Sequence, residues 1–309
     1  MDTQEKPSII LICGPTASGK TPLSLELARH YPVEIISADS RQVYRHMDIG
    51  TAKVSPEEQA LVPHHLIDVV DPDEAFDVSD FVCMGRRLVS EIQGRGCIPL
   101  IVGGTGLYIK SLTEGLIEAP SADETLRADL MRREQEEPGL LYTLLQQQDP
   151  EQAVQIHANN LVRIVRALEV ISLTGRKMSD IQKEHSFSDR PYHSLKIALG
   201  PPRPEHFEII NQRTLQMVRQ GLFEETEALL AMGYDPQGKA MRTLGYRESV
   251  AFLKGELSQD EAVFRIQVET RRYAKRQLTW FKKDHELIWV DSWRESDKIQ
   301  TFIDNFMLR

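Results

Sequence analysis

A glycine-rich stretch near the start of the chain has the residue types and spacing needed to hold a phosphate group. The run GPTASGKT fits the pattern GxxxxGK[ST] and follows the apolar residues IILIC. Its glycines let the backbone curl so that successive N–H groups converge on phosphate oxygens at the N-terminus of the next helix. Lys20 adds a mobile positive charge, and the Thr21 hydroxyl is placed to bind Mg²⁺. The predicted phosphate loop comprises Gly14, Pro15, Thr16, Ala17, Ser18, Gly19, Lys20 and Thr21.

The acidic residue nearest to this loop in the expected fold is Asp39, which follows the apolar run VEIIS. A nucleotide-hydrolysing enzyme usually completes its magnesium site with an acid after a later strand. Here the later run IPLIVGG leads into Gly104 and Thr105 instead. The sequence also contains no Asn/Thr-Lys-x-Asp stretch that would select guanine. These features weigh against the usual ATP or GTP chemistry of such a loop.

The elements that must position these residues alternate between strand and helix patterns. IILIC, VEIIS and IPLIVGG are predicted strands, and residues 20–30 and about 77–95 are predicted helices. In the second helix Phe81, Met84, Leu88 and Ile92 form one apolar stripe. This order predicts an α/β fold with a P-loop NTPase-like parallel sheet covered on both faces. The stretch between Asp39 and Asp80 lacks periodicity and is expected to be a long functional loop.

The middle of the chain has a different character. After Gly115 it is polar and helix-favouring, and Ser121 with Glu124 has the spacing of a capping box that would start a helix. Strand-like residues resume with LKIALG at Leu195, and a late strand is expected at LIWV. We predict a helical insertion domain over residues 119–194, within a core of residues 1–118 and 195–309 whose C-terminal part is mainly helical.

Four segments together resemble the tRNA dimethylallyltransferases, also called tRNA isopentenyltransferases: GPTASGKT, ISADSRQVYRHMDIGTAK, VGGTGLYIKSL and LGYRE. The resemblance runs from about Ile9 to Lys283. It implies transfer of a dimethylallyl group from dimethylallyl diphosphate to the exocyclic amine of adenine 37 of tRNA, beside the anticodon. The phosphate loop would then hold the leaving diphosphate, with Mg²⁺ as cofactor. Asp39 would act as general base, and Arg213 would join Lys20 and Thr21 in the catalytic group.

The chemistry of this reaction suits such residues. An aromatic amine is a poor nucleophile because its lone pair is delocalised into the ring, so a carboxylate that takes its proton helps. The bond to diphosphate breaks as negative charge collects on the leaving oxygens. Backbone N–H groups, Lys20, Arg213 and Mg²⁺ would stabilise that charge.

A local basic run offers a surface for RNA although the net charge of the chain is -9. Residues 271–283, RRYAKRQLTWFKK, contain no acid, and the capping-box pair Ser258 and Glu261 predicts one continuous helix into this run. Arg272, Lys275 and Arg276 share a helix face that can follow the phosphates of one RNA strand.

The resemblance implies further contacts with the tRNA anticodon stem-loop, some of them from the insertion. Gln42 carries both a donor and an acceptor, so we expect it to read the edge of an unstacked adenine. The implied positions are Asp39, Ser40, Arg41, Gln42, Thr105, Arg127, Arg163, Ile164, Val165, Arg166, Ala167, Arg242, Thr243, Leu244, Gly245, Tyr246 and Arg247.

Composition limits the other possibilities. Cys13, Cys83 and Cys97 form no CxxC pair and have no His at zinc spacing, so we expect buried, reduced thiols. No run approaches the roughly 18 apolar residues of a membrane span, and the N-terminus has no signal-peptide pattern. We expect a cytoplasmic monomer. The chain ends without the zinc-finger extension of the eukaryotic relatives, which favours a bacterial-type enzyme.

Two other functions remain open at this point. A small-molecule or nucleotide kinase would use Asp39 to hold an acceptor hydroxyl and would place Arg163 and Arg166 in a closing lid. A nucleotide-dependent RNA-binding switch would need no chemistry at all. The long block DSRQVYRHMDIGTAK has no role that we can name in either of them.

Overall fold

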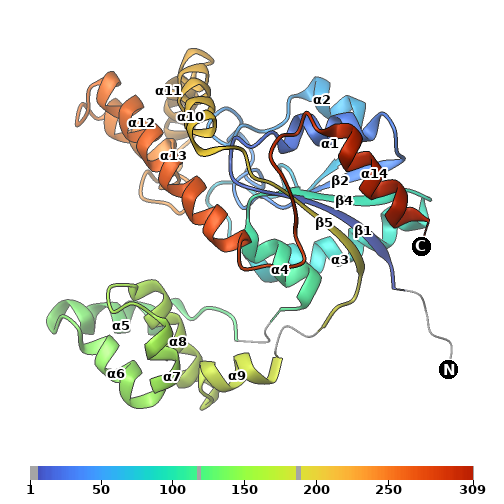
Figure 1. Ribbon diagram of the computed structural model, residues 1–309. Helices are drawn as coiled ribbons and strands as arrows, with labels where there is room; N and C mark the ends of the chain where they lie inside the picture. Colours follow the sequence, from blue (N-terminus) through green and yellow to red (C-terminus); the bar gives the residue numbers. More distant parts are fainter. Residues whose placement is uncertain (1–5, 117–119, 186–188, 309) are drawn as a thin grey trace. The chain divides into compact units, whose positions relative to one another are not determined.

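The computed structural model describes residues 6–116, 120–185 and 189–308, and its chain forms two compact units. The first unit combines Met1–Thr113 with Pro191–Arg309, and the second is Glu114–Arg190. Figure 1 shows the second unit in green and yellow as a group of helices without strands in its described part. The sequence analysis had set the limits of the insertion a few residues later, at 119 and 194.

The first unit is built on one parallel sheet of six strands in the order β3-β2-β4-β1-β5-β6. Each neighbouring pair of strands is parallel, as the alternation of strands and helices predicts. Cys13 at the end of β1 pairs with Gly103 of β4, so the carboxyl ends of these strands meet at one edge. The strands are β1 (Ser8–Cys13), β2 (Val33–Ser37), β3 (His64–His65), β4 (Ile98–Gly103), β5 (His193–Leu199) and β6 (Ile288–Val290).

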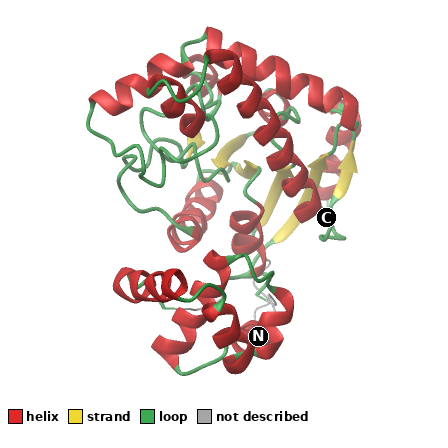
Figure 2. Cartoon of the chain, turned by 90° about the vertical axis from the view of Figure 1, so that its left-hand side faces the viewer, coloured by secondary structure: helices red, strands yellow, loops and turns green. Residues whose placement is uncertain are grey.

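Helices cover both faces of this sheet. Figure 1 shows α1 and α14 on one side and α3 and α4 on the other, and Figure 2 shows the yellow strands between red helices. Leu23 and Leu27 of α1 pack with Ile299 and Ile303 of α14 against the inner strands. The helices of this unit are α1 (Lys20–Ala28), α2 (Pro56–Leu61), α3 (Val78–Gly94), α4 (Gly106–Glu114), α10 (Arg203–Arg219), α11 (Leu222–Ala231), α12 (Tyr246–Leu253), α13 (Gln259–Phe281) and α14 (Ser296–Met307).

Helix α3 shows why the apolar stripe in the sequence was a good guide. Phe81, Leu88 and Ile92 of the stripe are buried, whereas Met84 is only partly buried. The Asp77 side chain accepts the N–H groups of Ser79 and Asp80 and so starts the helix. The predicted helix is thus confirmed to within a residue at each end.

The stretch between Asp39 and Asp80 was expected to be one long loop, but the structure contains regular elements within it. It contains α2, which begins at a capping box between Ser55 and Glu58, and the short strand β3, which pairs with β2. The sequence SPEE carries the capping signal with proline at the first helical position, so α2 could have been predicted.

The second unit packs its helices around a core that includes Leu141, Leu145, Ile164 and Leu168. The predicted start at Ser121 was wrong, because Asp123 caps α5 by accepting the N–H of Leu126 at 2.9 Å. An aspartate caps as well as a serine, and its charge favours the helix N-terminus. The helices are α5 (Glu124–Glu136), α6 (Leu140–Gln148), α7 (Pro150–Gln155), α8 (Leu161–Thr174) and α9 (Met178–His185).

Expectations drawn from composition have mixed outcomes. Cys13 is buried, but Cys83 is exposed and Cys97 is partly buried, and all three are free thiols. No helix in the described part of the chain has both the length and the apolar character needed to cross a membrane.

Candidate active site

The phosphate loop connects the carboxyl end of β1 to the first turn of α1. Gly14 and Gly19 adopt φ values of 145° and 91°, which favour glycine. A side chain at Gly14 would come within 2.6 Å of the Leu199 carbonyl oxygen, and one at Gly19 within 2.2 Å of the Trp293 ring. Both glycines are therefore required by the backbone and by close neighbours, which is what the motif predicts.

Lys20 turns back over its own loop. Its Nζ donates to the carbonyl oxygens of Gly14 at 3.1 Å and Pro15 at 2.7 Å. Burial lowers the pKa of Lys20 to about 8; Asp39 opposes this lowering, and the positive charge of Arg213 adds to it. The ammonium group is thus held beside the loop, where a bound diphosphate would replace protein carbonyls as its partner.

Polar groups in the loop suit an anion and a hard cation. The Ser18 hydroxyl is buried, and within the described residues it has no hydrogen-bond partner. Such an orphaned group suits a loop that binds a ligand, since buried polar atoms are normally paired. Among the residues that the structure covers, no cluster of three or more His, Cys, Asp or Glu could hold a metal. That Mg²⁺ binds here with the Thr21 hydroxyl as a ligand stays a prediction from the motif.

Asp39 lies just past the carboxyl end of β2, on the same edge of the sheet as the loop. Its Oδ1 accepts the N–H of Arg41 at 2.8 Å, and the next residue, Ser40, donates its N–H to the Thr105 hydroxyl at 3.0 Å. The Thr105 N–H in turn donates to the Ala38 oxygen at 3.1 Å. Thr105 thereby fixes the segment that carries Asp39.

Arg213 reaches the loop from α10. Its Nη1 lies 3.5 Å from the Thr16 hydroxyl oxygen. Burial lowers the pKa of Arg213, and the negative charge of Asp39 opposes that lowering. Arg213 and Lys20 thus both contact the phosphate loop, and Asp39 follows the neighbouring edge of the sheet, although the sequence places the three residues far apart.

The Gln42 amide is hydrogen-bonded to other groups of the protein. Its Oε1 accepts from the Ser37 hydroxyl at 3.1 Å, and its Nε2 donates to the Ala52 and Thr51 oxygens at 3.2 and 3.4 Å. These bonds tie the start of the loop over residues 39–53 to its end. Both polar atoms of the Gln42 amide are therefore used within the protein in this structure, and its reading of an adenine edge stays a prediction.

The same loop is held by Glu225, which no sequence pattern pointed to, and by Tyr246, which was predicted to contact tRNA. The Glu225 carboxylate accepts the N–H groups of Asp48, Ile49 and Gly50 at 3.0, 2.8 and 3.1 Å. The Tyr246 hydroxyl donates to the same carboxylate at 2.6 Å. Tyr246 is fully buried, so its side chain supports the loop rather than a tRNA surface.

The remaining positions of the segment 242–247 divide by exposure. Arg242 and Arg247 are exposed, whereas Thr243 and Gly245 are buried and Leu244 is partly buried. Only the two arginines offer charge to a partner, and Arg247 is paired with Glu248.

Helix α13 has the two faces that the sequence predicts. Arg272, Lys275 and Arg276 are exposed on one of them, with Arg272 paired to Glu269 and Arg276 lying over the Tyr273 ring. Ala274, Gln277 and Phe281 are buried on the other face. We call the exposed set Arg272, Lys275 and Arg276 the basic face of α13.

In the second unit, two predicted tRNA contacts instead neutralise a buried carboxylate. Glu169 is 0% exposed and accepts from Arg127 Nε at 2.8 Å and from Arg166 Nη1 at 2.5 Å. Arg166 also donates to the Pro120 oxygen at 2.8 Å. A buried charge needs such partners, so both arginines have a structural role.

The other positions of the run 163–167 differ in their access to solvent. Ile164, Val165 and Ala167 belong to the core of the second unit, so their side chains are not available to RNA. Arg163 is exposed.

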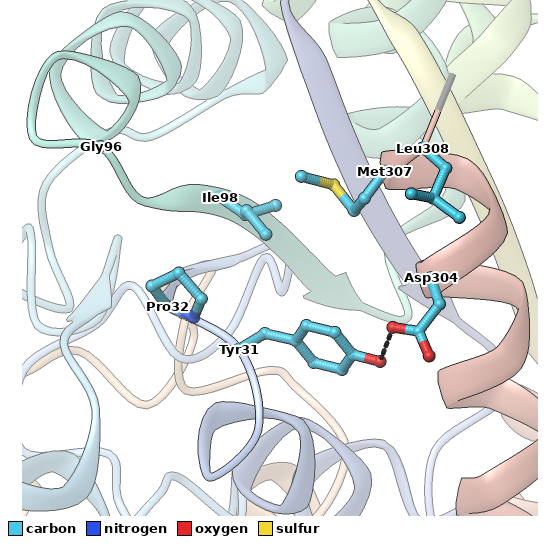
Figure 3. Close-up of a pocket in the computed structure, with 7 residues that line it drawn as sticks. All are labelled: Tyr31, Pro32, Gly96, Ile98, Asp304, Met307 and Leu308. Atoms are coloured by element: carbon cyan, nitrogen blue, oxygen red, sulfur yellow. Dashed lines mark hydrogen bonds between the residues drawn. The ribbon is translucent and has the colours of Figure 1, made fainter.

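A cavity of about 450 Å³ lies at the opposite edge of the sheet (Figure 3). Tyr31 and Pro32 precede β2, and Gly96 and Ile98 lie at the start of β4. Ligands of parallel α/β sheets bind at the carboxyl edge, where the phosphate loop and Asp39 lie. The cavity at the amino edge is therefore separate from the candidate active site.

Comparison with known proteins agrees with this geometry. The family model described as IPP transferase matches residues 42–284, and the one described as isopentenyl transferase matches residues 7–66. A tRNA dimethylallyltransferase 1 from Syntrophotalea carbinolica is 53% identical over 98% of this chain and 97% of its own. A tRNA dimethylallyltransferase from Geobacter sulfurreducens is 48% identical, covering 97% of each chain.

Solved structures give the same result. The tRNA isopentenylpyrophosphate transferase of Bacillus halodurans is 39% identical, with a TM-score of 0.71 over 97% of both chains. A eukaryotic dimethylallyltransferase acting on tRNA gives a TM-score of 0.81 at 27% identity, over 96% of this chain and 80% of that one. With family models, relatives and solved structures in agreement over nearly its whole length, the chain belongs to the tRNA dimethylallyltransferase family.

Proposed function

We propose that the protein transfers a dimethylallyl group from dimethylallyl diphosphate to the exocyclic amine of adenine 37 of tRNA, beside the anticodon, and releases diphosphate. The observation that carries this proposal is that Lys20 and Arg213 both contact the phosphate loop, while Asp39 follows β2 at the same carboxyl edge of the sheet. One group can take a proton while the other two stabilise a leaving anion, and prenyl transfer to an amine needs both. Because the substrate is tRNA, we place this activity in the cytoplasm.

In the proposed reaction a bond forms between the amine nitrogen and the allylic carbon as the carbon–oxygen bond to diphosphate breaks. The electron pair of that bond leaves with the diphosphate oxygen. The amine proton passes to the Asp39 carboxylate, whose Oδ1 is oriented by the Arg41 N–H. Transfer of the proton keeps the amine nucleophilic as the new bond forms.

The leaving diphosphate would be held by the backbone N–H groups of the phosphate loop together with Lys20 and Arg213. The Lys20 ammonium would exchange its two carbonyl partners for diphosphate oxygens, and Arg213 already reaches the loop, so both charges lie close to where negative charge would develop. A bound Mg²⁺, held by Thr21 and diphosphate oxygens, would supply further charge neutralisation. The kinase alternative loses support because each of the relatives named above is a prenyl transferase acting on tRNA.

The proposal is tested by incubating the protein with radiolabelled dimethylallyl diphosphate and unmodified tRNA, then digesting the RNA to nucleosides. We expect label on the adenosine that follows the anticodon. ATP with the same tRNA serves as the control for a kinase. Label transferred from ATP, with none from dimethylallyl diphosphate, would contradict the proposed function.

Replacing Arg272, Lys275 and Arg276 together by alanine should weaken the binding of different tRNAs to a similar extent. Phosphate contacts carry little sequence information, and each lost contact removes part of the salt dependence. We expect the negative slope of log affinity against log salt concentration to become shallower by about 2. Filter binding over a salt series measures it.

A matched control removes the same charge from other helices of the first unit. Arg29, Arg87 and Lys298 are exposed and make only surface ion pairs, so their joint replacement should leave the slope unchanged. An unchanged slope in the variant of the basic face would remove α13 from the RNA-binding surface.

Replacing Arg213 by alanine should weaken the binding of inorganic diphosphate in the presence of Mg²⁺ by about 10–100-fold, since a charge-assisted hydrogen bond is lost. Calorimetry measures this without turnover. Arg219 is exposed at the end of the same helix, and Arg219→Ala is the control. Equal diphosphate affinity in Arg213→Ala and the parent would remove Arg213 from the site.

A further inference from the structure

One side chain on the buried face of α13 joins two loops of the active site. Gln277 is 7% exposed, and its Oε1 accepts the Thr16 N–H of the phosphate loop at 2.8 Å. Its Nε2 donates to the carbonyl oxygen of Gly104, just after β4, at 2.9 Å. A single amide therefore uses both of its polar atoms to hold the phosphate loop beside the turn that follows β4.

This turn leads on to the proposed general base. Thr105 follows Gly104 directly, and its hydroxyl accepts the N–H of Ser40, the neighbour of Asp39. Hydrogen bonds thus run from the phosphate loop through Gln277 and Thr105 to the segment that carries Asp39. The approach is close, because a side chain at Gly104 would lie 2.3 Å from Gln277 Nε2.

A second helix fixes the other side of the Thr16 residue. The Thr16 carbonyl oxygen accepts from His206 Nε2 at 2.8 Å. Burial lowers the pKa of His206, and the hydrogen bond to the Thr16 carbonyl opposes this lowering. Both backbone polar groups of Thr16 are thus held by side chains from other helices, its N–H by Gln277 and its carbonyl by His206.

We propose that Gln277 is a positioning residue that sets the distance between the phosphate loop and Asp39. This inference rests on the proposed function, in which the loop holds the leaving group and Asp39 takes the proton of the attacking amine. The reacting atoms must approach to about 3–3.5 Å, and a misplacement of about 1 Å can cost about 10²-fold in rate. Only a side chain with one donor and one acceptor at this reach can serve both loops.

The experiment compares Gln277→Met, which keeps the length of the side chain but neither hydrogen bond, with Gln277→Glu, which keeps only the acceptor. We expect the single-turnover rate of prenyl transfer to fall by about 10–100-fold in both variants. The affinity for tRNA should stay within about twofold, since the basic face of α13 points away from Gln277. Gln267→Met is the control, because Gln267 also bonds to another element from α13, at the Asn211 oxygen.

A second readout separates positioning from mere support of the fold. If Gln277 acts through the placement of Asp39, then Gln277→Met should cost about threefold or less when Asp39 is already asparagine. A full additive loss in the double variant, or a rate in Gln277→Met equal to that of the parent, would overturn the inference. Failure of the proposed function itself looks different, since the parent would then transfer no prenyl group to tRNA.

Discussion

Asp39→Asn should slow the chemical step by about 10²–10⁴-fold, the usual contribution of a positioned general base. Asparagine keeps the shape of the side chain and one oxygen to accept the Arg41 N–H, but it lacks the charge and the basicity needed to take the amine proton. Both substrates should still bind, and diphosphate affinity should be equal or slightly higher because a negative charge is removed. Single-turnover kinetics, with tRNA and diphosphate binding measured separately, gives each quantity.

Two further variants test whether the loss of rate comes from the missing base at position 39. Asp39→Ala should be no faster than Asp39→Asn. Asp304→Asn makes the same chemical change at the amino edge of the sheet, where the carboxylate accepts from Tyr31, and should keep the parental rate. Transfer by Asp39→Asn within about threefold of the parent would mean that Asp39 is not the base.

Lys20→Ala should lower the rate of transfer by about 10²–10³-fold, as expected for the loss of one preorganised group that stabilises a developing anion. Binding of tRNA should be nearly unchanged, because the Lys20 ammonium faces the carbonyl groups of its own loop. Filter binding and single-turnover assays on the same preparation separate the two effects.

The pKa of Lys20 adds a test by pH. Burial lowers this pKa from its ordinary value of 10.5 to about 8, so the ammonium is charged below pH 8 and loses its proton above it. The parental kcat/KM for dimethylallyl diphosphate should therefore fall as the pH rises through about 8, since this ratio reports the free enzyme. Lys20→Ala should lack that limb of the profile. If the limb persists in the variant, another group is responsible for it.

The sequence was sufficient to predict those elements and site residues that depend on a short stretch of neighbouring residues. The phosphate loop, Asp39 after β2 and the capped start of α13 each depend on residues within a short stretch, and each lies where it was predicted. The sequence did not predict the roles of three residues whose partners lie far away in the chain, namely Gln277, His206 and Glu225. Gln277 forms a hydrogen bond with Thr16, which lies 261 positions away in the sequence, and no sequence pattern around either residue predicts this contact.

The family resemblance points to the run 163–167 as a whole and does not say which of its side chains are buried. A helix that covers a core must bury part of every turn, so Ile164, Val165 and Ala167 could not all face a ligand. The pairing of Arg127 and Arg166 with Glu169 depends on how α5 and α8 pack, which no spacing in the sequence reveals.

The contact between Glu225 and the loop at residues 48–50 has a consequence for selectivity among anions. Successive backbone N–H groups that point to one side form a concave nest that attracts phosphate oxygens. Asp48, Ile49 and Gly50 present such a nest, and the protein fills it with its own Glu225 carboxylate. Glu225 thus occupies these three donors with a carboxylate of the protein itself. A diphosphate or an RNA phosphate that would lodge in this nest must first displace a tethered anion, which leaves the phosphate loop as the more accessible of the two anion sites.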